Sequence, residues 1–245
     1  MHCHIVPCVD DGSNDIKLSL EMGKRAQKLG YTGIFATSHY IIHDNETDNK
    51  EYKNKIEELN ETFKNENIDI KVYEGNEVFF TNDLLGCIEN KKVSTLGGTK
   101  YVLVELPLYN EIIPMNVYEE FNKLQEAGYK PILAHPERYG FVSKNINHLV
   151  FLIDSGILMQ ANIASITGKY GRTAKKNIKK MIKNDMVHFL GTDSHSLSVY
   201  KVYKKAIKKI RKLFSDDEKM DLVLNENPKL VLEDKDVNFW YPKTI

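Results

Sequence analysis

Hydrophobic residues along the chain follow two spacings that alternate from one end to the other. Short apolar runs of β character are separated by longer segments in which apolar residues recur every three or four positions, the spacing of one helix face. The β runs lie at residues 2–6, 31–37, 68–73, 101–104, 130–133, 157–161 and 187–190. The helical spacing predicts helices around residues 18–29, 52–63, 117–124, 146–153, 174–181 and 203–210. Gly30, Gly128 and Gly156 follow three of these segments, where helix ends favour glycine.

This order of strands and helices predicts an α/β fold with a parallel sheet. An open doubly wound sheet and a closed barrel both satisfy it. No glycine-rich phosphate loop follows the first β run, which disfavours the nucleotide-binding form of the open sheet. The length of 245 residues suits an α/β barrel, and we find no linker, repeat or low-complexity segment. We therefore predict one domain over residues 1–245.

Composition and charge exclude some classes of partner. The 34 basic and 34 acidic residues balance, as in an ordinary globular protein. Fourteen Lys or Arg residues lie between Lys169 and Lys212 against two acidic residues. We interpret them as solvated faces of two amphipathic helices rather than as a flank that attracts an anionic substrate. No basic motif is interleaved with aromatic residues, so we predict no nucleic-acid partner.

Cysteine usage and hydropathy indicate the compartment. The three cysteines, Cys3, Cys8 and Cys87, form no CxxC pair, and an odd number suits a reducing environment better than a disulfide framework. No apolar run approaches the roughly 18 residues of a membrane span. The first residues do not read as a basic segment followed by an apolar one, as a secretory signal would. We expect a cytoplasmic protein without direct membrane insertion, and the sequence leaves its oligomeric state open.

Residues able to bind metal ions occur at the ends of six of the seven β runs. Because the carboxyl ends of parallel strands meet at one edge of a sheet, these side chains are expected to converge. In the first run, strand alternation places His2 and His4 on one face and Cys3 on the other. The candidates are His2, His4, Asp10, Asp11, His39, Glu77, Glu105, His135, Asp193 and His195.

This set of side chains predicts a metal centre with two or more ions. Imidazole and carboxylate ligands together suit Zn, Mn, Fe or Ni rather than Ca. The set exceeds the three or four protein ligands of a single catalytic zinc. Clusters of this kind generate hydroxide at neutral pH and hold a phosphoryl group during in-line displacement, which indicates a phosphoesterase. Chance is a poor explanation for this set, because it would have to place a metal-binding residue at six separate strand ends.

Other residues that could carry chemistry give weaker signals. His43, His148 and His188 are expected to be ordinary hydrogen-bonded residues, and His188 begins a strand, at the opposite edge of the sheet. Neither Cys8 nor Cys87 has an Arg six positions later, so the thiolate phosphatase loop is absent, as is a GxSxG nucleophile motif.

Arg138 lies three residues after the candidate ligand His135. A guanidinium beside a metal cluster can bind phosphate with two parallel hydrogen bonds, and we favour this role over a surface ion pair.

Five sequence motifs, in order over essentially the whole chain, resemble one family. They are His-Cys-His-Ile-Val-Pro-Cys-Val-Asp-Asp-Gly at 2–12, Glu-Gly-Asn-Glu-Val at 74–78, Leu-Ala-His-Pro-Glu-Arg-Tyr at 133–139, Gln-Ala-Asn at 160–162 with Ile-Thr-Gly at 166–168, and Thr-Asp-Ser-His at 192–195. The sequence resembles the polymerase-and-histidinol-phosphatase (PHP) superfamily. Within it, the sequence is most similar to bacterial tyrosine-protein phosphatases of capsular or extracellular polysaccharide synthesis. The opening motif and the His-Pro-Glu-Arg box are the most specific.

The resemblance implies a distorted seven-stranded (β/α) barrel, similar to a TIM barrel, with three metal ions. Manganese is the expected metal, with Fe or Zn as alternatives. One ion would be held by His2, His4, Glu77 and Asp193. A second would be held by Glu77, Glu105 and His135. The third would be held by Asp11, His39 and His195.

The resemblance also implies a reaction and a partner. A hydroxide bridging metal ions would attack phosphorus without a covalent enzyme intermediate, with Arg138, Asp193 and His195 as catalytic residues and Arg138 binding phosphate. The substrate would be a phosphotyrosine-bearing protein, expected to be a bacterial tyrosine kinase. The sequence departs from the family in lacking a second phosphate-binding Arg shortly after the Asp-x-His motif. Tyr200 stands at the equivalent place, and Lys201 is a candidate substitute.

Two other functions remain open from the sequence. The same metals could serve a small phosphomonoester such as histidinol phosphate, which a closed pocket with additional cations would favour. A non-catalytic metal-binding regulatory module would keep the ligands without turnover. An amidohydrolase would often carry a metal-bridging lysine, and no lysine at a strand end fits that position.

Overall fold

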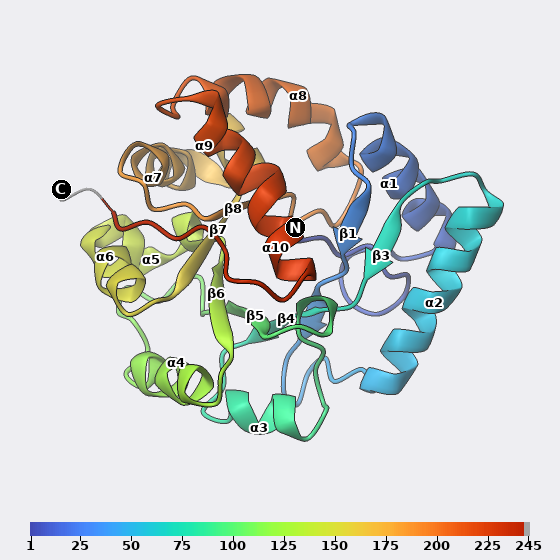
Figure 1. Ribbon diagram of the computed structural model, residues 1–245, viewed down its shortest axis with the longest axis horizontal. Helices are drawn as coiled ribbons and strands as arrows, with labels where there is room; N and C mark the ends of the chain where they lie inside the picture. Colours follow the sequence, from blue (N-terminus) through green and yellow to red (C-terminus); the bar gives the residue numbers. More distant parts are fainter. Residues whose placement is uncertain (243–245) are drawn as a thin grey trace.

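A curved parallel sheet surrounded by helices organises residues 1–242, which the computed structural model describes (Figure 1). The six strands of this sheet, in spatial order, are β2 (Ser38–Tyr40), β4 (Asn76–Phe79), β5 (Tyr101–Glu105), β6 (Lys130–Ala134), β7 (Leu158–Asn162) and β8 (Phe189–Gly191). Each neighbouring pair is parallel. A separate parallel pair is formed by β1 (Gly33–Phe35) and β3 (Lys71–Tyr73). The α/β class and the parallel sheet are therefore confirmed.

The predicted seven-stranded barrel is not confirmed. The first β run, residues 2–6, forms no strand and contributes only two isolated bridges, from Cys3 to Ala36 and from Cys3 to Ser194. The run at 68–73 ends as β3, and the chain resumes as β4 after Gly75. A Cβ atom at Gly75 would lie 2.8 Å from Leu96 and 3.2 Å from the Ala36 carbonyl oxygen. This close packing explains why glycine stands between the two strands, and the sequence pattern does not show it.

All six predicted helices are confirmed, with further short ones. The helices are α1 (Ile16–Lys28), α2 (Asn49–Asn65), α3 (Leu84–Glu89), α4 (Val117–Glu126), α5 (Gly140–Lys144), α6 (Asn147–Asp154), α7 (Gly171–Lys183), α8 (Ser198–Arg211), α9 (Asp217–Asp221) and α10 (Asn227–Leu232). Asp15 caps α1, because its carboxylate accepts a hydrogen bond from the Leu18 amide at 2.7 Å. Among the described residues, no helix is long and apolar enough to cross a membrane.

The two faces of the sheet can be followed along β5. Val102 and Val104 point outward and belong to the large core formed with the surrounding helices. Tyr101 and Leu103 point inward, into a second apolar cluster enclosed by the curve of the sheet. Glu105, the last residue of β5, lies on the same inward side by strand alternation. The enclosed side therefore changes from apolar to ionisable toward the carboxyl ends of the strands.

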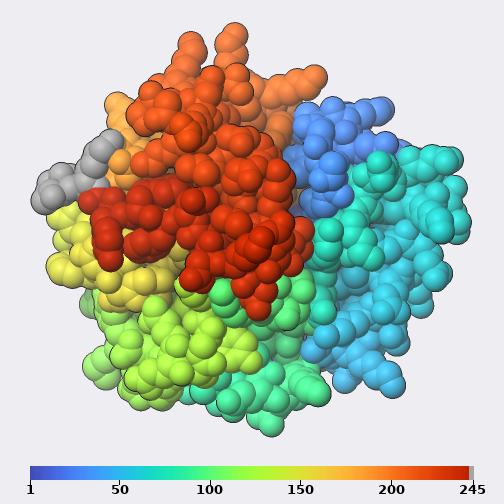
Figure 2. All heavy atoms as spheres, in the orientation of Figure 1, coloured from blue at the N-terminus to red at the C-terminus, as the bar shows by residue number. Residues whose placement is uncertain are grey.

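The C-terminal segment covers the opposite, amino-terminal edge of the sheet (Figures 1 and 2, red). Asn227 in α10 donates to the carbonyl oxygen of His188, just before β8, at 3.0 Å. The Tyr101 hydroxyl, at the start of β5, donates to the Lys235 carbonyl oxygen at 2.7 Å. These contacts close the amino-terminal edge and leave access from the carboxyl-terminal edge.

Candidate metal centre

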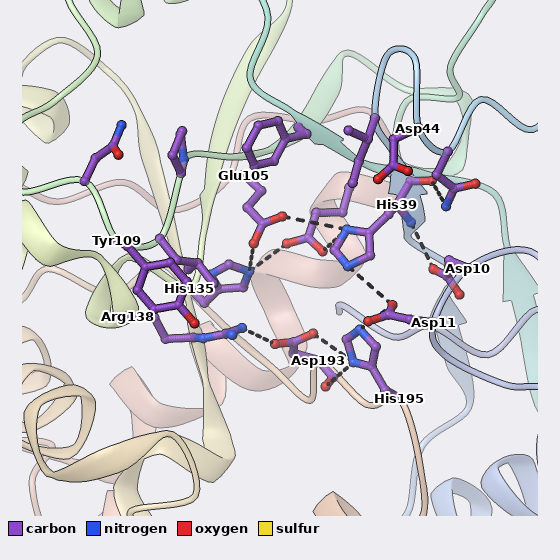
Figure 3. A pocket seen from close by; sticks show the side chains of 17 residues that line it. Asp10, Asp11, His39, Asp44, Glu105, Tyr109, His135, Arg138, Asp193 and His195 are labelled. Atoms are coloured by element: carbon purple, nitrogen blue, oxygen red, sulfur yellow. Dashed lines mark hydrogen bonds and ion pairs between the residues drawn. The ribbon is translucent and has the colours of Figure 1, made fainter.

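The nine predicted metal ligands lie together at the carboxyl ends of the strands. His39 belongs to β2, Glu77 to β4 and Glu105 to β5. The other six come from segments next to strands: His2, His4, Asp11, His135, Asp193 and His195. Figure 3 labels Asp11, His39, Glu105, His135, Asp193 and His195 around one cavity. Their convergence is the arrangement that the strand-end pattern predicts.

The deepest group consists of His2, His4, Glu77 and Asp193, which are all buried. The Nε2 atoms of His2 and His4 are 3.1 Å apart. Glu77 Oε2 lies 3.2 Å from the first and 3.3 Å from the second. Asp193 Oδ1 lies 3.6 and 3.4 Å from the same two nitrogen atoms. Four potential ligand atoms therefore surround one point.

Two further groups share members with the first. His39 Nδ1 is 3.1 Å from Glu77 Oε2 and 3.7 Å from Glu105 Oε2. His135 Nε2 approaches the same two carboxylates, at 2.7 Å from Glu77 Oε1 and 3.5 Å from Glu105 Oε1. Glu77 therefore lies between the deep group and this one.

The third group is nearer to the solvent. Asp11 Oδ1 lies 3.3 Å from His195 Nε2 and 3.6 Å from His39 Nε2. His4 Nε2 and the nitrogens of these two histidines lie close enough to share an ion with Asp11.

Unsatisfied polar atoms show that these residues fit metal ions. Glu77 Oε2, Asp193 Oδ1 and His39 Nδ1 are buried without a hydrogen-bond partner. Leaving such groups unpaired in a protein interior is costly. Two ligands bound about 2.0–2.2 Å from one ion, at tetrahedral or octahedral angles, lie about 2.8–3.6 Å apart. The spacings of 3.1–3.6 Å in the deep group are of this size.

Neighbouring charges keep the two carboxylates of the deep group, Glu77 and Asp193, in their ionised form. Burial alone would raise the pKa of Glu77, but the charges of His2 and His135 outweigh it and hold that pKa well below its usual range. The pKa of Asp193 is likewise held low, against the effect of burial, by His2 and His4. Burial and the nearby Glu77 instead raise the pKa of Glu105 to about 7. Concentrated negative charge of this kind favours cation binding.

Two of the ligands have unusual backbone conformations. His135 has φ of 33° and Asp193 has φ of 47°, in the left-handed region that non-glycine residues rarely adopt. Such conformations cost free energy and cluster at functional sites, where the surrounding fold maintains them. Here they occur where β6 and β8 end, and both side chains point into the cluster (Figure 3).

A second layer of hydrogen bonds orients the histidines. Asp10 Oδ2 accepts from His4 Nδ1 at 2.7 Å, and Gln160 Oε1 accepts from His2 Nδ1 at 2.8 Å. Each bond leaves Nε2 of the same ring free to face the cluster, which is how metal-binding histidines are usually held. Asn162 donates to Asp193 Oδ2 at 2.6 Å. The sequence predicts Asp10 as a candidate ligand, whereas here it orients His4. Gln160 and Asn162 have no predicted role of their own, and their signal in the sequence is two alternate polar residues at the end of a β run.

Arg138 lies at the wall of the cavity, half-buried, beside the cluster. Its Nη1 donates to Asp193 Oδ2 at 3.0 Å, and its guanidinium carbon lies 4.6 Å from the centre of the Tyr170 ring. Among the described residues that line the cavity, Arg138 is the only one with a permanent positive charge. It stands where the predicted phosphate-binding residue is needed.

Tyr200 and Lys201, the other predicted substrate-binding residues, lie elsewhere. Tyr200 is only 7% exposed and packs in the core, with its hydroxyl 3.8 Å from Cys3 Sγ. Lys201 is exposed on α8. Neither is among the described residues that line the cavity, so the geometry lends no support to their predicted role.

The three histidines expected to have ordinary roles lie outside the cluster. His43 is exposed and His148 lies on α6. His188 Nδ1 accepts the Met159 amide at 3.0 Å, at the amino-terminal edge of the sheet.

The cavity above the cluster has a volume of about 740 Å³. Seven of the nine predicted ligands line it, with His2 and His4 buried beneath. Its rim includes residues 107–110, and within this rim Tyr109 is 92% exposed. An α/β sheet with a cluster of carboxylates and imidazoles beneath an accessible cavity defines a candidate metallohydrolase.

The chain belongs to the CpsB/CapC family of capsular polysaccharide synthesis, which it matches over residues 1–233. It is 33% identical to CapC of Staphylococcus aureus, with 99% of this chain and 94% of that protein covered. It is 28% identical to the tyrosine-protein phosphatase YwqE of Bacillus subtilis, over 97% of this chain and 92% of that protein. The resemblance seen in the sequence motifs is thereby confirmed.

A solved structure resembles the whole molecule. It comes from the work on YwqE of B. subtilis and CpsB of Streptococcus pneumoniae, described as unique metal-dependent tyrosine phosphatases. The TM-score is 0.92 at 26% sequence identity, with 100% of this chain and 98% of that chain covered. The curved sheet and its helices are thus shared with this pair of enzymes.

Proposed function

We propose that this protein is a metal-dependent protein-tyrosine phosphatase. The observation that carries the proposal is the cluster of nine side chains able to bind metal ions beneath an accessible cavity with Arg138 at its wall. The family and the named activities of YwqE and CpsB support it. Residues 1–245 would form one functional domain.

We propose two or three divalent ions, with manganese as the first metal to test. His2, His4, Glu77 and Asp193 would hold one ion, and Glu77, Glu105 and His135 a second. Asp11, His39 and His195 would hold the third. Such ions supply Lewis acidity that activates water at neutral pH and neutralises phosphoryl charge. Without them the carboxylates lining the cavity would repel a phosphate dianion.

The chain's own residues would bind and orient the substrate. Arg138 has five N–H donors, of which one donates to Asp193, so others remain for phosphate oxygens. Asp193 orients this guanidinium as well as belonging to the deep group. His195 lies beside Asp193, with Nδ1 3.4 Å from Oδ1, and would complete the site on the solvent side.

The shape of the entrance favours phosphotyrosine on a protein. The cavity opens beside an exposed apolar loop in which Tyr109, Ile112 and Met115 are 92%, 79% and 95% exposed. A peptide chain could lie across such a loop while its phosphotyrosine reaches the cluster. We propose a bacterial tyrosine kinase of polysaccharide synthesis as the partner, met in the cytoplasm. The free state of Cys3, Cys8 and Cys87 suits a reducing compartment.

Turnover of matched substrates tests this proposal. The Mn²⁺-loaded protein should hydrolyse a phosphotyrosyl peptide at least about tenfold more efficiently, in kcat/KM, than histidinol phosphate or the corresponding phosphoseryl peptide. A preference for histidinol phosphate would instead identify a small-molecule phosphatase. Metal binding without turnover of any of the three would identify a non-catalytic metal-binding module.

A further inference from the structure

A second cation lies close to Arg138, on the segment that precedes α7. Lys169 Nζ is 5.9 Å from the centre of the Tyr170 ring, and Arg138 lies 4.6 Å from the centre of the same ring. One aromatic side chain therefore has two positive charges beside it. An anion bound between or beside the two cations would be attracted by both.

Lys169 is also connected to the loop that carries His195. Its Nζ donates a hydrogen bond to the Ser198 hydroxyl, and the Ser198 and Ser196 hydroxyl oxygens are 2.9 Å apart. Ser196 directly follows His195. Lys169 is therefore linked to the β8–α8 loop that carries His195, although it is not itself among the described residues that line the cavity.

No carboxylate among the described residues forms an ion pair with Lys169. Partial burial lowers the pKa of this ammonium, and the charge of Asp193 acts in the opposite direction. Asp193 is therefore near enough to act on Lys169 without being bonded to it. The charge of Lys169 remains available to an incoming anion.

We propose that Lys169 is a substrate-binding residue that pairs with the phosphoryl group alongside Arg138. A phosphomonoester carries nearly two negative charges and three acceptor oxygens, more than Arg138 alone neutralises. The Lys169 side chain has four flexible methylene groups and can exchange the Ser198 hydroxyl for a phosphate oxygen. This proposal rests on the proposed phosphatase function and names a specificity residue for it.

The position of Lys201 provides a rival for the same role. It follows the Asp-x-His motif more closely in sequence, but it is exposed on α8. Neither lysine is among the described residues that line the cavity, and of the two only Lys169 lies beside the Tyr170 ring that Arg138 also contacts. Lys204, exposed on the same helix, is a matched control whose substitution is expected to have no effect. The three lysines can therefore be distinguished by one substitution each.

Binding of inorganic phosphate to the Mn²⁺-loaded protein, measured by calorimetry, tests the proposal without requiring turnover. Lys169→Gln should raise the phosphate Kd, and the KM for a phosphotyrosyl peptide, by about five- to tenfold, the loss of one charged hydrogen bond at a partly exposed site. Lys169→Arg should stay within about threefold of wild type, because it keeps the charge. Lys204→Gln should change neither quantity. Metal content should be equal in all variants.

Two results would overturn the assignment of Lys169. One is a phosphate Kd in Lys169→Gln that equals that of the wild type. The other is a larger loss in Lys201→Gln than in Lys169→Gln. An inactive wild type that still binds phosphate through Lys169 would overturn the proposed phosphatase function and leave the anion site standing.

Discussion

The two edges of the same sheet differ in what their buried polar groups contact. At the amino-terminal edge, the Tyr101 hydroxyl donates to the Lys235 carbonyl and accepts from the Val237 amide, at 2.7 and 3.1 Å. At the carboxyl-terminal edge, buried oxygens of Glu77 and Asp193 have no hydrogen-bond partner. The Tyr101 hydroxyl is satisfied by the chain itself, although His188 Nε2 and Trp240 Nε1, near the same edge, are also buried without a hydrogen-bond partner. At the other edge the unpaired carboxylate oxygens gather around one point, an arrangement that suits cations. Contacts that stabilise the fold therefore gather at one edge of the sheet, and the candidate metal centre lies at the other.

Two buried histidines show the same contrast. Burial lowers the pKa of His188, at the amino-terminal edge, to about 4. His135, at the carboxyl-terminal edge, is also buried, yet Glu77 outweighs burial and raises its pKa to about 9. The residue type is the same, and the neighbouring charge decides the difference.

The largest effect is expected from removing a predicted ligand. His135→Ala or Asp193→Ala should reduce kcat/KM on a phosphotyrosyl peptide by more than about 10³-fold, because metal centres supply several kcal/mol of transition-state stabilisation. His148→Ala, a histidine of α6 outside the cluster, is the control. Wild-type turnover in both ligand variants would refute a catalytic role for the cluster.

A smaller effect is expected from removing a hydrogen-bond partner of a predicted ligand. Asp10→Asn removes the charge that orients His4 and should weaken metal binding by about 10- to 100-fold, as losses of such partners generally do. Excess Mn²⁺ should restore most of the turnover, which it cannot do for a lost ligand. Metal titration followed by activity measures both quantities. Asp154→Asn, at the exposed end of α6, should behave as wild type; an Asp10 variant with unchanged metal affinity would contradict the prediction.

At the amino-terminal edge, the expected effect is on stability and depends on pH. The folded pKa of His188 is about 4 and the unfolded value is 6.5, so the unfolded chain takes up the proton first as the pH falls. The stabilisation is therefore present above pH 6.5 and is lost toward pH 4. Between pH 7 and pH 5 the wild type should lose about 2 kcal/mol of unfolding free energy more than His188→Asn.

Urea unfolding at the two pH values checks this prediction. The Asn side chain keeps an acceptor for the Met159 amide, so the variant isolates the titration. Equal pH dependence in both proteins would show that His188 does not titrate as the structure indicates.

The smallest effect is expected at a helix cap remote from both edges. Asp15→Ala removes the N-cap of α1 and should cost about 1 kcal/mol of unfolding free energy. Glu21→Ala, on the exposed side of the same helix, should cost little, and kcat/KM should change less than about twofold in both. Thermal unfolding and peptide turnover measure the two quantities; a large loss of activity in Asp15→Ala would show that α1 acts on the site.

The sequence predicts the presence of helices and strands better than the points at which strands begin, end or are interrupted. Helices and β runs are predictable because their spacing is local, but the packing of Gly75 against Leu96 and Ala36 involves residues that are distant in the chain. The first run forms only bridges from Cys3, to Ala36 and Ser194, and its local apolar pattern does not predict this. Helices α9 and α10 are short and carry no clear period, so no prediction was made there.

The predicted ligands can be identified from the sequence because strand ends converge in a parallel sheet. The residues that form hydrogen bonds to these ligands cannot. Gln160 acts on His2, which is 158 residues away, and no local pattern reveals such a bond. Sequence proximity to the Asp-x-His motif also suggested Tyr200, but α8 turns this side chain into the core. Lys169, beside Tyr170 and Ser198, shows no motif of its own.

Phosphate release from a tyrosine-phosphorylated peptide, with added Mn²⁺ and in parallel with EDTA, tests the metal centre most directly. Release with Mn²⁺ that EDTA abolishes, and that returning Mn²⁺ restores, is the result expected if the unsatisfied carboxyl-terminal edge is a catalytic metal site. Equal release in both tubes would contradict this account, because without metal the described residues that line the cavity offer a phosphate dianion one permanent cation, Arg138, among several carboxylates.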